Sequence, residues 1–128
     1  MKEAISTKEA PAAIGPYSQA VRAGGLLFVS GQIPLDPVTG ELVRGDAAAQ
    51  AEQVMKNLRA VLEAGGCGFG DVVRATVYLV DLAQFGAVNA VYERFVPAPY
   101  PARATLQVAA LPRGAQVEIE VTALVPPG

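Results

Sequence analysis

Two segments with helical periodicity divide a chain whose other patterned segments resemble β-strands. In the first, Asp46 precedes a run in which apolar residues recur every three or four positions as far as Gly65 and Gly66. This spacing is typical of a helix with one buried face, and an Asp before it and a Gly after it are common capping residues. In the second, Asp81 precedes an apolar stripe that ends at the proline-rich stretch 97–101. We therefore expect two helices, which begin after Asp46 and Asp81.

Five segments have the composition of strands, and residues 1–16 are expected to form an arm or loop. The predicted strands are residues 17–22, 26–30, 72–80, 103–110 and 117–125. Ala-Gly-Gly between the first two indicates a hairpin, and a turn is expected at 112–115 between the last two. The order ββαβαββ predicts a single α+β domain over residues 1–128, in which two helices pack on one face of a mixed sheet.

Composition excludes several kinds of chemistry. The 128 residues include no histidine and one cysteine, so histidine-based triads, histidine metal sites and thiolate metal clusters are ruled out. The net charge is −2 and the basic residues are scattered singly, which argues against a nucleic-acid partner. No apolar run resembles a signal peptide or approaches the ~20 residues of a membrane span. We therefore expect a cytoplasmic protein, with Cys67 as a small buried or inert loop residue.

The last two predicted strands contain most of the polar side chains that could bind a ligand or take part in catalysis. A tight turn at 112–115 would place Ala109 opposite Glu118, and Gln107 opposite Glu120. That register would put the apolar side chains of both strands on one face of the sheet. The other face would carry five polar side chains: Arg103, Thr105, Gln107, Glu118 and Glu120. The polar face could simply be solvated, or it could form a site in which an arginine binds a carboxylate near an acid.

Four motifs, in order along the chain, match one known family. They are AIGPYSQA at 13–20, VSGQIP at 29–34, VNAVY at 88–92, and PARATL at 101–106 followed by VEI at 117–119. From about residue 13 to residue 124 the chain resembles the RidA (YjgF) family of imine/enamine deaminases. The resemblance implies a chorismate-mutase-like fold, a homotrimer with sites at the subunit interfaces, and no cofactor. It also implies hydrolysis of 2-iminobutanoate and 2-iminopropanoate, which derive from enamines such as 2-aminoacrylate, to 2-keto acids and ammonia.

The resemblance also implies roles for individual residues. Arg103 would bind the substrate carboxylate, and Glu118 would orient the attacking water. Four others would line the pocket: Tyr17, Ser30, Gly31 and Asn89. Thr105 stands where many members have cysteine, so a role for that thiol does not carry over, although the backbone at Thr105 could still contact the ligand. Two alternatives are an RNA-binding translation inhibitor or endoribonuclease, and a trimer that binds small ligands without turnover.

The predicted hairpin has a consequence for the site. Arg103 would lie opposite Leu124, which is six residues beyond Glu118. At ~3.3 Å per residue the two side chains would be roughly 20 Å apart along the strand. A three-carbon substrate cannot span that distance, so we expect Arg103 and Glu118 of one site to come from different subunits.

Overall fold

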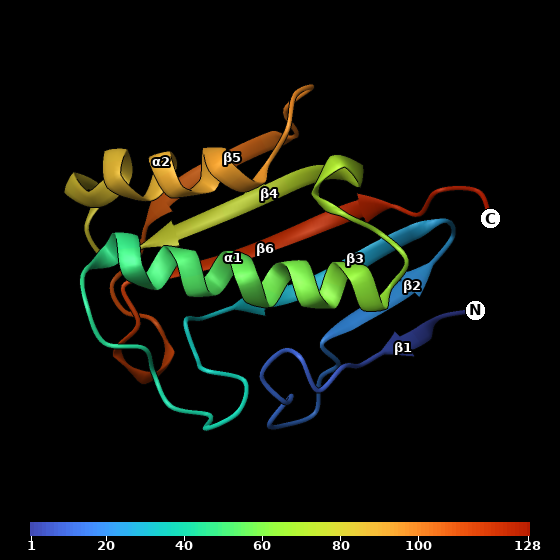
Figure 1. Cartoon of the computed structure of the whole chain (residues 1–128), viewed down its shortest axis with the longest axis horizontal. Helices are drawn as coiled ribbons and strands as arrows, with labels where there is room; N and C mark the ends of the chain where they lie inside the picture. The colour runs from blue at the N-terminus through green and yellow to red at the C-terminus, as the bar shows by residue number, and fades with distance from the viewer.

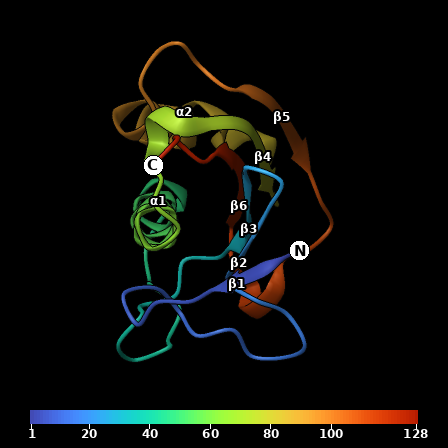
Figure 2. The same cartoon turned by 90° about the vertical axis from the view of Figure 1, so that its right-hand side faces the viewer.

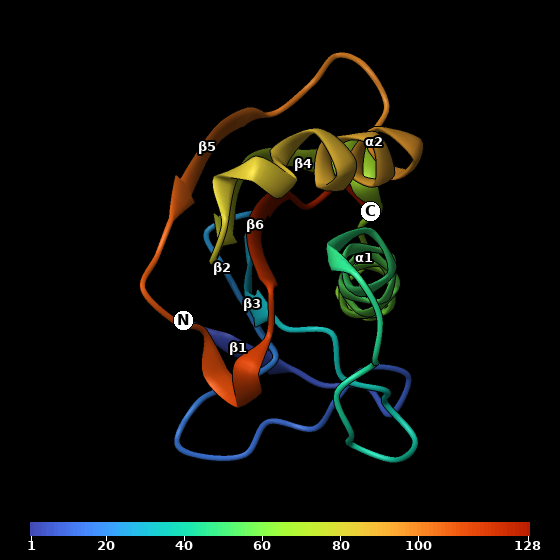
Figure 3. The same cartoon turned by 90° about the vertical axis from the view of Figure 1, so that its left-hand side faces the viewer.

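The computed structural model describes residues 1–128 and contains one six-stranded sheet with two helices on a single face (Figure 1). The helices are α1 (Ala47–Ala64) and α2 (Phe85–Phe95). The strands are β1 (Glu3–Ile5), β2 (Ala20–Ala23), β3 (Leu26–Gln32), β4 (Val72–Leu79), β5 (Ala102–Gln107) and β6 (Val117–Leu124). Figures 2 and 3 show both helices on the same side of the sheet. The predicted α+β class and the one-sided helical layer are therefore confirmed.

The predicted start of α1 is confirmed, whereas α2 begins at Phe85, after a short 3₁₀ turn. The Asp46 carboxylate accepts a hydrogen bond from Ala49 N at 2.9 Å, which satisfies one of the free amides at the start of α1. Asp81 caps a short 3₁₀ turn at Leu82–Gln84, and this turn leads directly into α2. At the other end of α1, Gly66 has a φ of 82°, a conformation that glycine adopts without steric penalty. Neither helix is both long enough and apolar enough to cross a bilayer.

The core lies between the helices and the sheet. Helix α1 contributes fully buried side chains: Ala51, Val54, Met55, Leu58, Val61 and Leu62. They form one cluster with buried residues of the central strands, such as Leu79 of β4 and Ile119 of β6. Burying one large aliphatic side chain stabilises a protein by about 1.5–3 kcal/mol relative to exposure, so this layer holds α1 against the sheet.

The predicted hairpin between the last two strands is wrong. The strand order is β1-β2-β3-β6-β4-β5, so β4 lies between β5 and β6. Helix α2 connects β4 to β5 as a crossover, which makes these two strands parallel and leaves the other edge of β4 for β6. The turn expected at 112–115 does form, at Pro112–Gly114, but it joins strands that are not neighbours. Arg103 lies opposite Ala75 rather than Leu124, and Glu118 lies opposite Tyr78 rather than Ala109.

This topology also corrects the predicted polar face. Arg103 is beside Ala75, which is fully buried beneath the helices, so Arg103 lies on the helix-covered face of the sheet. Thr105 and Gln107 follow on the same face, because alternate residues of a strand point the same way. Glu118 lies beside Tyr78 on the opposite face, which no helix covers and which we call the open face. Arg103 and Glu118 of one chain are thus on opposite sides of the sheet.

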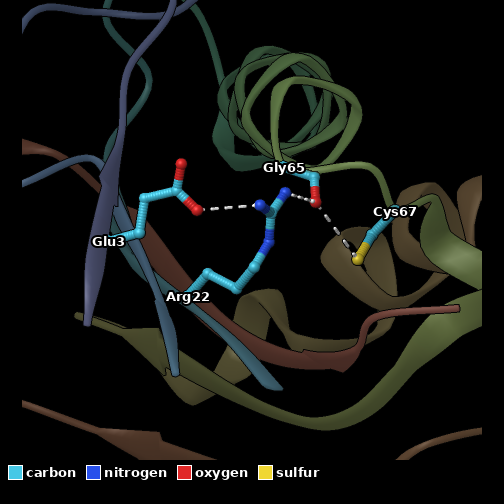
Figure 4. A network of polar contacts seen from close by, with 4 residues as sticks. All are labelled: Glu3, Arg22, Gly65 and Cys67. Carbon is cyan, nitrogen blue, oxygen red and sulfur yellow. Dashed lines mark hydrogen bonds and ion pairs between the residues drawn. The ribbon is translucent and has the colours of Figure 1, made fainter. Parts of the chain in front are cut away.

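The N-terminal arm is more ordered than expected. Residues 3–5 form the edge strand β1, and the strand predicted to begin at residue 17 begins at Ala20. Arg22 of β2 donates hydrogen bonds to Glu3 Oε1 at 2.9 Å and to Gly65 O at 2.7 Å, which joins β1 and β2 to the end of α1 (Figure 4). Cys67 lies beside this network and is buried, as predicted, and burial raises the pKa of its thiol.

Candidate functional site

Arg103 is held in place by three side chains of α2. Its Nη1 donates a hydrogen bond to Asn89 Oδ1 at 2.7 Å. The guanidinium carbon lies 4.8 Å from the centre of the Tyr92 ring and 5.5 Å from that of Phe85. Cation–π contact and a hydrogen bond fix the plane of the guanidinium. Its remaining N–H groups can then donate in a fixed geometry, which suits a planar carboxylate.

A cleft of about 330 Å³ opens beside this guanidinium. It is lined by Asn89, Tyr92, Glu93, Tyr100, Pro101 and Arg103. Its size suits a small molecule. Arg103 and Asn89 were predicted to belong to one site, and the structure brings them together. Tyr92 belongs to the VNAVY motif but was given no role in the site. No sequence signal placed Tyr100 here, because its position depends on the path of the proline-rich loop.

Glu118 is half-buried on the open face and has no ion-pair partner. Burial raises the pKa of its carboxyl group, and the negative charge of Glu120 raises the same pKa further. Removing a carboxylate from water disfavours its charged form, and a second negative charge nearby does the same. Glu118 therefore exchanges a proton closer to neutral pH than an ordinary glutamate does, as a general acid and base requires.

A bulge in β3 brings Gly31 against Glu118. Val29 pairs with Val121 and Gln32 pairs with Ile119, so two residues of β3 oppose one residue of β6 between these pairs. A Cβ atom at position 31 would overlap Glu118 Oε2. The absence of a side chain at Gly31 is thus what allows the carboxylate to occupy this place.

Ser30 and Tyr17 lie near the same bulge. The Ser30 hydroxyl donates to Ser18 O at 2.5 Å, and Ser30 N donates to Gln19 O at 2.9 Å. These bonds attach the segment that carries Tyr17 to β3. Tyr17 is 54% exposed, so it is not part of the core.

The role of Gln19 was not predicted from the sequence. Its buried amide accepts a hydrogen bond from Thr7 N at 2.6 Å and donates to Pro11 O at 2.7 Å, so it holds the N-terminal arm over the start of β2. An isolated glutamine within AIGPYSQA has no pattern that distinguishes a clamp from a surface amide.

The predicted site residues therefore form two half-sites. The arginine half-site comprises Arg103 and Asn89, with Thr105 half-buried two residues further along β5 on the same face. The carboxylate half-site comprises Glu118, Gly31 and Ser30, with Tyr17 nearby. Arg103 and Glu118 are two strands apart and displaced by three positions, roughly 10 Å in each direction, and they lie on opposite faces. One chain does not bring its two half-sites together.

Replacing Gly31 by alanine is expected to displace the Glu118 carboxylate, because the new Cβ would overlap Oε2. A misplacement of about 1 Å can lower a rate by ~10²-fold, so we expect a loss of this order in kcat for any reaction that uses Glu118. Gly68→Ala is the matched control, since a Cβ there meets nothing within 4 Å and its φ is negative. Equal activity of the two variants would refute this role of Gly31.

The fold and the half-sites are those of a small α+β protein that can bind a carboxylate-bearing ligand with an arginine and offer it a proton-exchanging glutamate. Residues 7–125 match a model of the family described as Endoribonuclease L-PSP. The chain is 51% identical to the 2-iminobutanoate/2-iminopropanoate deaminase of Mus musculus, over 97% of this chain and 92% of the mouse protein. The chain belongs to the RidA (YjgF) family.

Solved structures agree with this assignment. The crystal structure of RidA from the Antarctic bacterium Psychrobacter sp. PAMC 21119 matches with a TM-score of 0.92 and 49% identity, over 96% of this chain and 99% of that one. The structure of E. coli TdcF with bound serine matches with a TM-score of 0.89 and 41% identity, over 95% of this chain and 98% of that one.

Proposed function

We propose that this protein hydrolyses 2-imino acids such as 2-iminopropanoate and 2-iminobutanoate to 2-keto acids and ammonia. Relatives about half identical to it over nearly the whole chain are named for this activity. The observation that carries the proposal is Arg103, which Asn89 and Tyr92 fix at a small open cleft. Such an arginine can anchor the carboxylate that every 2-imino acid carries. The bound serine of E. coli TdcF is likewise a small carboxylate-bearing molecule.

Hydrolysis of an imine needs one water and one group that exchanges protons. Glu118 takes a proton from water as the water oxygen bonds to the imine carbon. The electron pair of the C=N double bond moves to nitrogen, and Glu118 returns the proton to this nitrogen. Glu118 then takes the proton of the carbinolamine hydroxyl and passes it to the amine nitrogen. As the C=O bond forms, the electron pair of the C–N bond goes to that nitrogen, so ammonia leaves and the keto acid remains. A raised pKa suits Glu118 to both accepting and returning a proton. No cofactor takes part in this scheme, and the hydroxyl of Thr105 is not required.

We further propose that each site is completed by two subunits of a cyclic homotrimer. The two half-sites of one chain face opposite sides of its sheet, so a second copy must bring its carboxylate half-site to the arginine half-site of the first. The open face also carries exposed apolar side chains, including Phe28, Leu106 and Leu124, which a subunit interface would cover. A cyclic trimer repeats one such contact three times. We place this trimer in the cytoplasm, with the enzymes that release enamine intermediates.

The experiment that tests the activity generates 2-iminopropanoate in situ and follows keto-acid and ammonia formation with and without the protein. We expect both products to appear faster with the protein. Ligand binding with no change in either rate would favour a trimer that binds without turnover.

Endoribonuclease activity is the second candidate, because the family description carries that name. The chain has no histidine to act as the usual acid and base in RNA cleavage. RNA cleavage that persisted through purification at high salt, and that was lost in Arg103→Ala, would support this alternative.

A further inference from the structure

Glu118 has a second acidic residue and a tyrosine as its neighbours on the open face. Glu120 follows two positions along β6 and projects from the same face of the sheet. Tyr78 of β4 pairs directly with Glu118, and its hydroxyl donates a hydrogen bond to Glu120 Oε1. The phenol thus lies next to one carboxylate while it is bonded to the other.

Within one chain, no cation forms an ion pair with either carboxylate, although Arg74 of β4 lies on the same face, opposite Thr122. The protein's ion pairs involve Glu3 and Glu52, not Glu118 or Glu120. On the other side of Glu118, the bulge of β3 presents Ser30 and Gly31, neither of which is charged. The Tyr78 phenol is the only side-chain hydrogen-bond partner of Glu120, and the charge of Glu120 acts on Glu118.

We propose that Tyr78 is a positioning residue that acts through Glu120: its hydrogen bond holds the Glu120 carboxylate beside Glu118 and thereby controls how readily Glu118 exchanges protons. The proposal rests on the proposed function, because it concerns the group that handles water in imine hydrolysis. Tyr78 itself touches no reacting atom in this scheme.

The physical basis is a sequence of two effects. The hydrogen bond that Tyr78 donates fixes the place of the Glu120 carboxylate on the open face. A fixed negative charge on the same face opposes ionisation of Glu118, and the pKa of Glu118 is raised by Glu120 after the larger effect of burial. The same hydrogen bond raises the pKa of Tyr78, so the phenol remains a donor across the working pH range. Without the phenol, no side-chain hydrogen bond holds the Glu120 carboxylate beside Glu118.

The test is a direct titration of Glu118 by NMR in protein labelled with ¹³C at the glutamate carboxyl carbon. Glu118→Gln assigns the signal. Glu120→Gln is expected to lower the pKa of Glu118, and Tyr78→Phe is expected to lower it by a smaller amount. Glu63→Gln, which removes the same charge from an exposed position at the end of α1, is expected to leave it unchanged.

The double variant Tyr78→Phe/Glu120→Gln decides how Tyr78 acts. If Tyr78 acts through Glu120, the double variant titrates like Glu120→Gln alone, since the two changes are not additive. Additive shifts would mean that Tyr78 acts on Glu118 directly, and an unchanged pKa in Tyr78→Phe would also overturn the proposal. Tyr78→Phe keeps the ring, so its melting temperature controls for misfolding.

The pH dependence of turnover provides a second measurement. Glu118 accepts a proton as its carboxylate, so kcat falls as the pH drops through its pKa, and this acid limb should move to lower pH in Tyr78→Phe and further in Glu120→Gln. The titration requires no turnover. Full activity in Glu118→Gln would therefore refute the role of Glu118 in hydrolysis, while the titration would still decide whether Tyr78 acts through Glu120.

Discussion

Replacing Arg103 by alanine is expected to lower kcat/KM for 2-iminopropanoate by ~10²-fold or more while the fold remains intact. The guanidinium is the only cation lining the cleft, and losing a charge-assisted anchor commonly costs about 3 kcal/mol or more, which corresponds to this factor. Arg103→Lys should also be impaired, because an ammonium cannot donate in a planar fork and loses the geometry that Asn89 and Tyr92 impose on the guanidinium.

Steady-state kinetics and circular dichroism check this prediction. Arg44→Ala is the matched control, because it removes the same charge from an exposed position away from the cleft. Near-normal activity of Arg103→Ala, with Arg44→Ala also active, would show that the carboxylate is anchored elsewhere.

Replacing Glu118 by glutamine is expected to lower kcat by ~10²–10⁴-fold, the range that a general acid–base group contributes. Glutamine keeps the shape of the side chain beside Gly31 but cannot take a proton from water. Binding of a stable carboxylate analogue should change little, because Arg103 provides that contact. A variant that kept its kcat would assign the proton transfers to another group.

The same variant has an expected effect on stability, with a definite sign. The pKa of Glu118 is raised in the folded protein, so its protonated form is favoured there and its ionisation opposes folding. The stability associated with the protonated form is present below the ordinary pKa of 4.5 and is lost as the pH rises through the folded-state pKa. The melting temperature of Glu118→Gln should therefore be higher than that of the unmodified protein at pH 7. The difference between the two melting temperatures should shrink as the pH falls below 4.5. A lower melting temperature at neutral pH would contradict this account.

Local features of the sequence predicted the helices and much of the sheet correctly. Asp46 caps α1 as expected, and Asp81 caps the 3₁₀ turn that leads into α2, because capping depends only on residues within one turn. The Ala-Gly-Gly turn at 23–25 joins β2 to β3 as expected, with Gly24 and Gly25 both at positive φ. These elements require no knowledge of distant contacts.

Strand order could not be predicted in the same way. A turn at 112–115 suits a hairpin, yet β6 pairs with β3 and β4 because the α2 crossover places β5 at the edge. The alternation of polar and apolar residues along 103–107 shows which side chains share a face of the sheet. It does not show whether that face is the open face or the one that the helices cover. Arg103 was therefore assigned to the open face, although α2 covers it through Asn89 and Tyr92.

The candidate site was predicted in its parts rather than in its arrangement. Arg103 with Asn89, and Glu118 with Gly31, are neighbours as the family motifs implied. The expectation that two subunits share each site was derived from a wrong register. The observed topology supports it on a different ground, because Arg103 and Glu118 lie on opposite faces of the sheet, and it remains a prediction.

Subunit complementation tests this central claim most directly. Arg103→Ala and Glu118→Gln chains are coexpressed with different affinity tags, and assemblies that carry both tags are isolated. If each site takes Arg103 from one subunit and Glu118 from the next, every mixed trimer contains one intact site, and about a third of the unmodified turnover should return from two nearly inactive parents. If both residues of a site came from one chain, no mixed assembly would contain an intact site. Turnover no higher than that of the parents would then contradict the shared site.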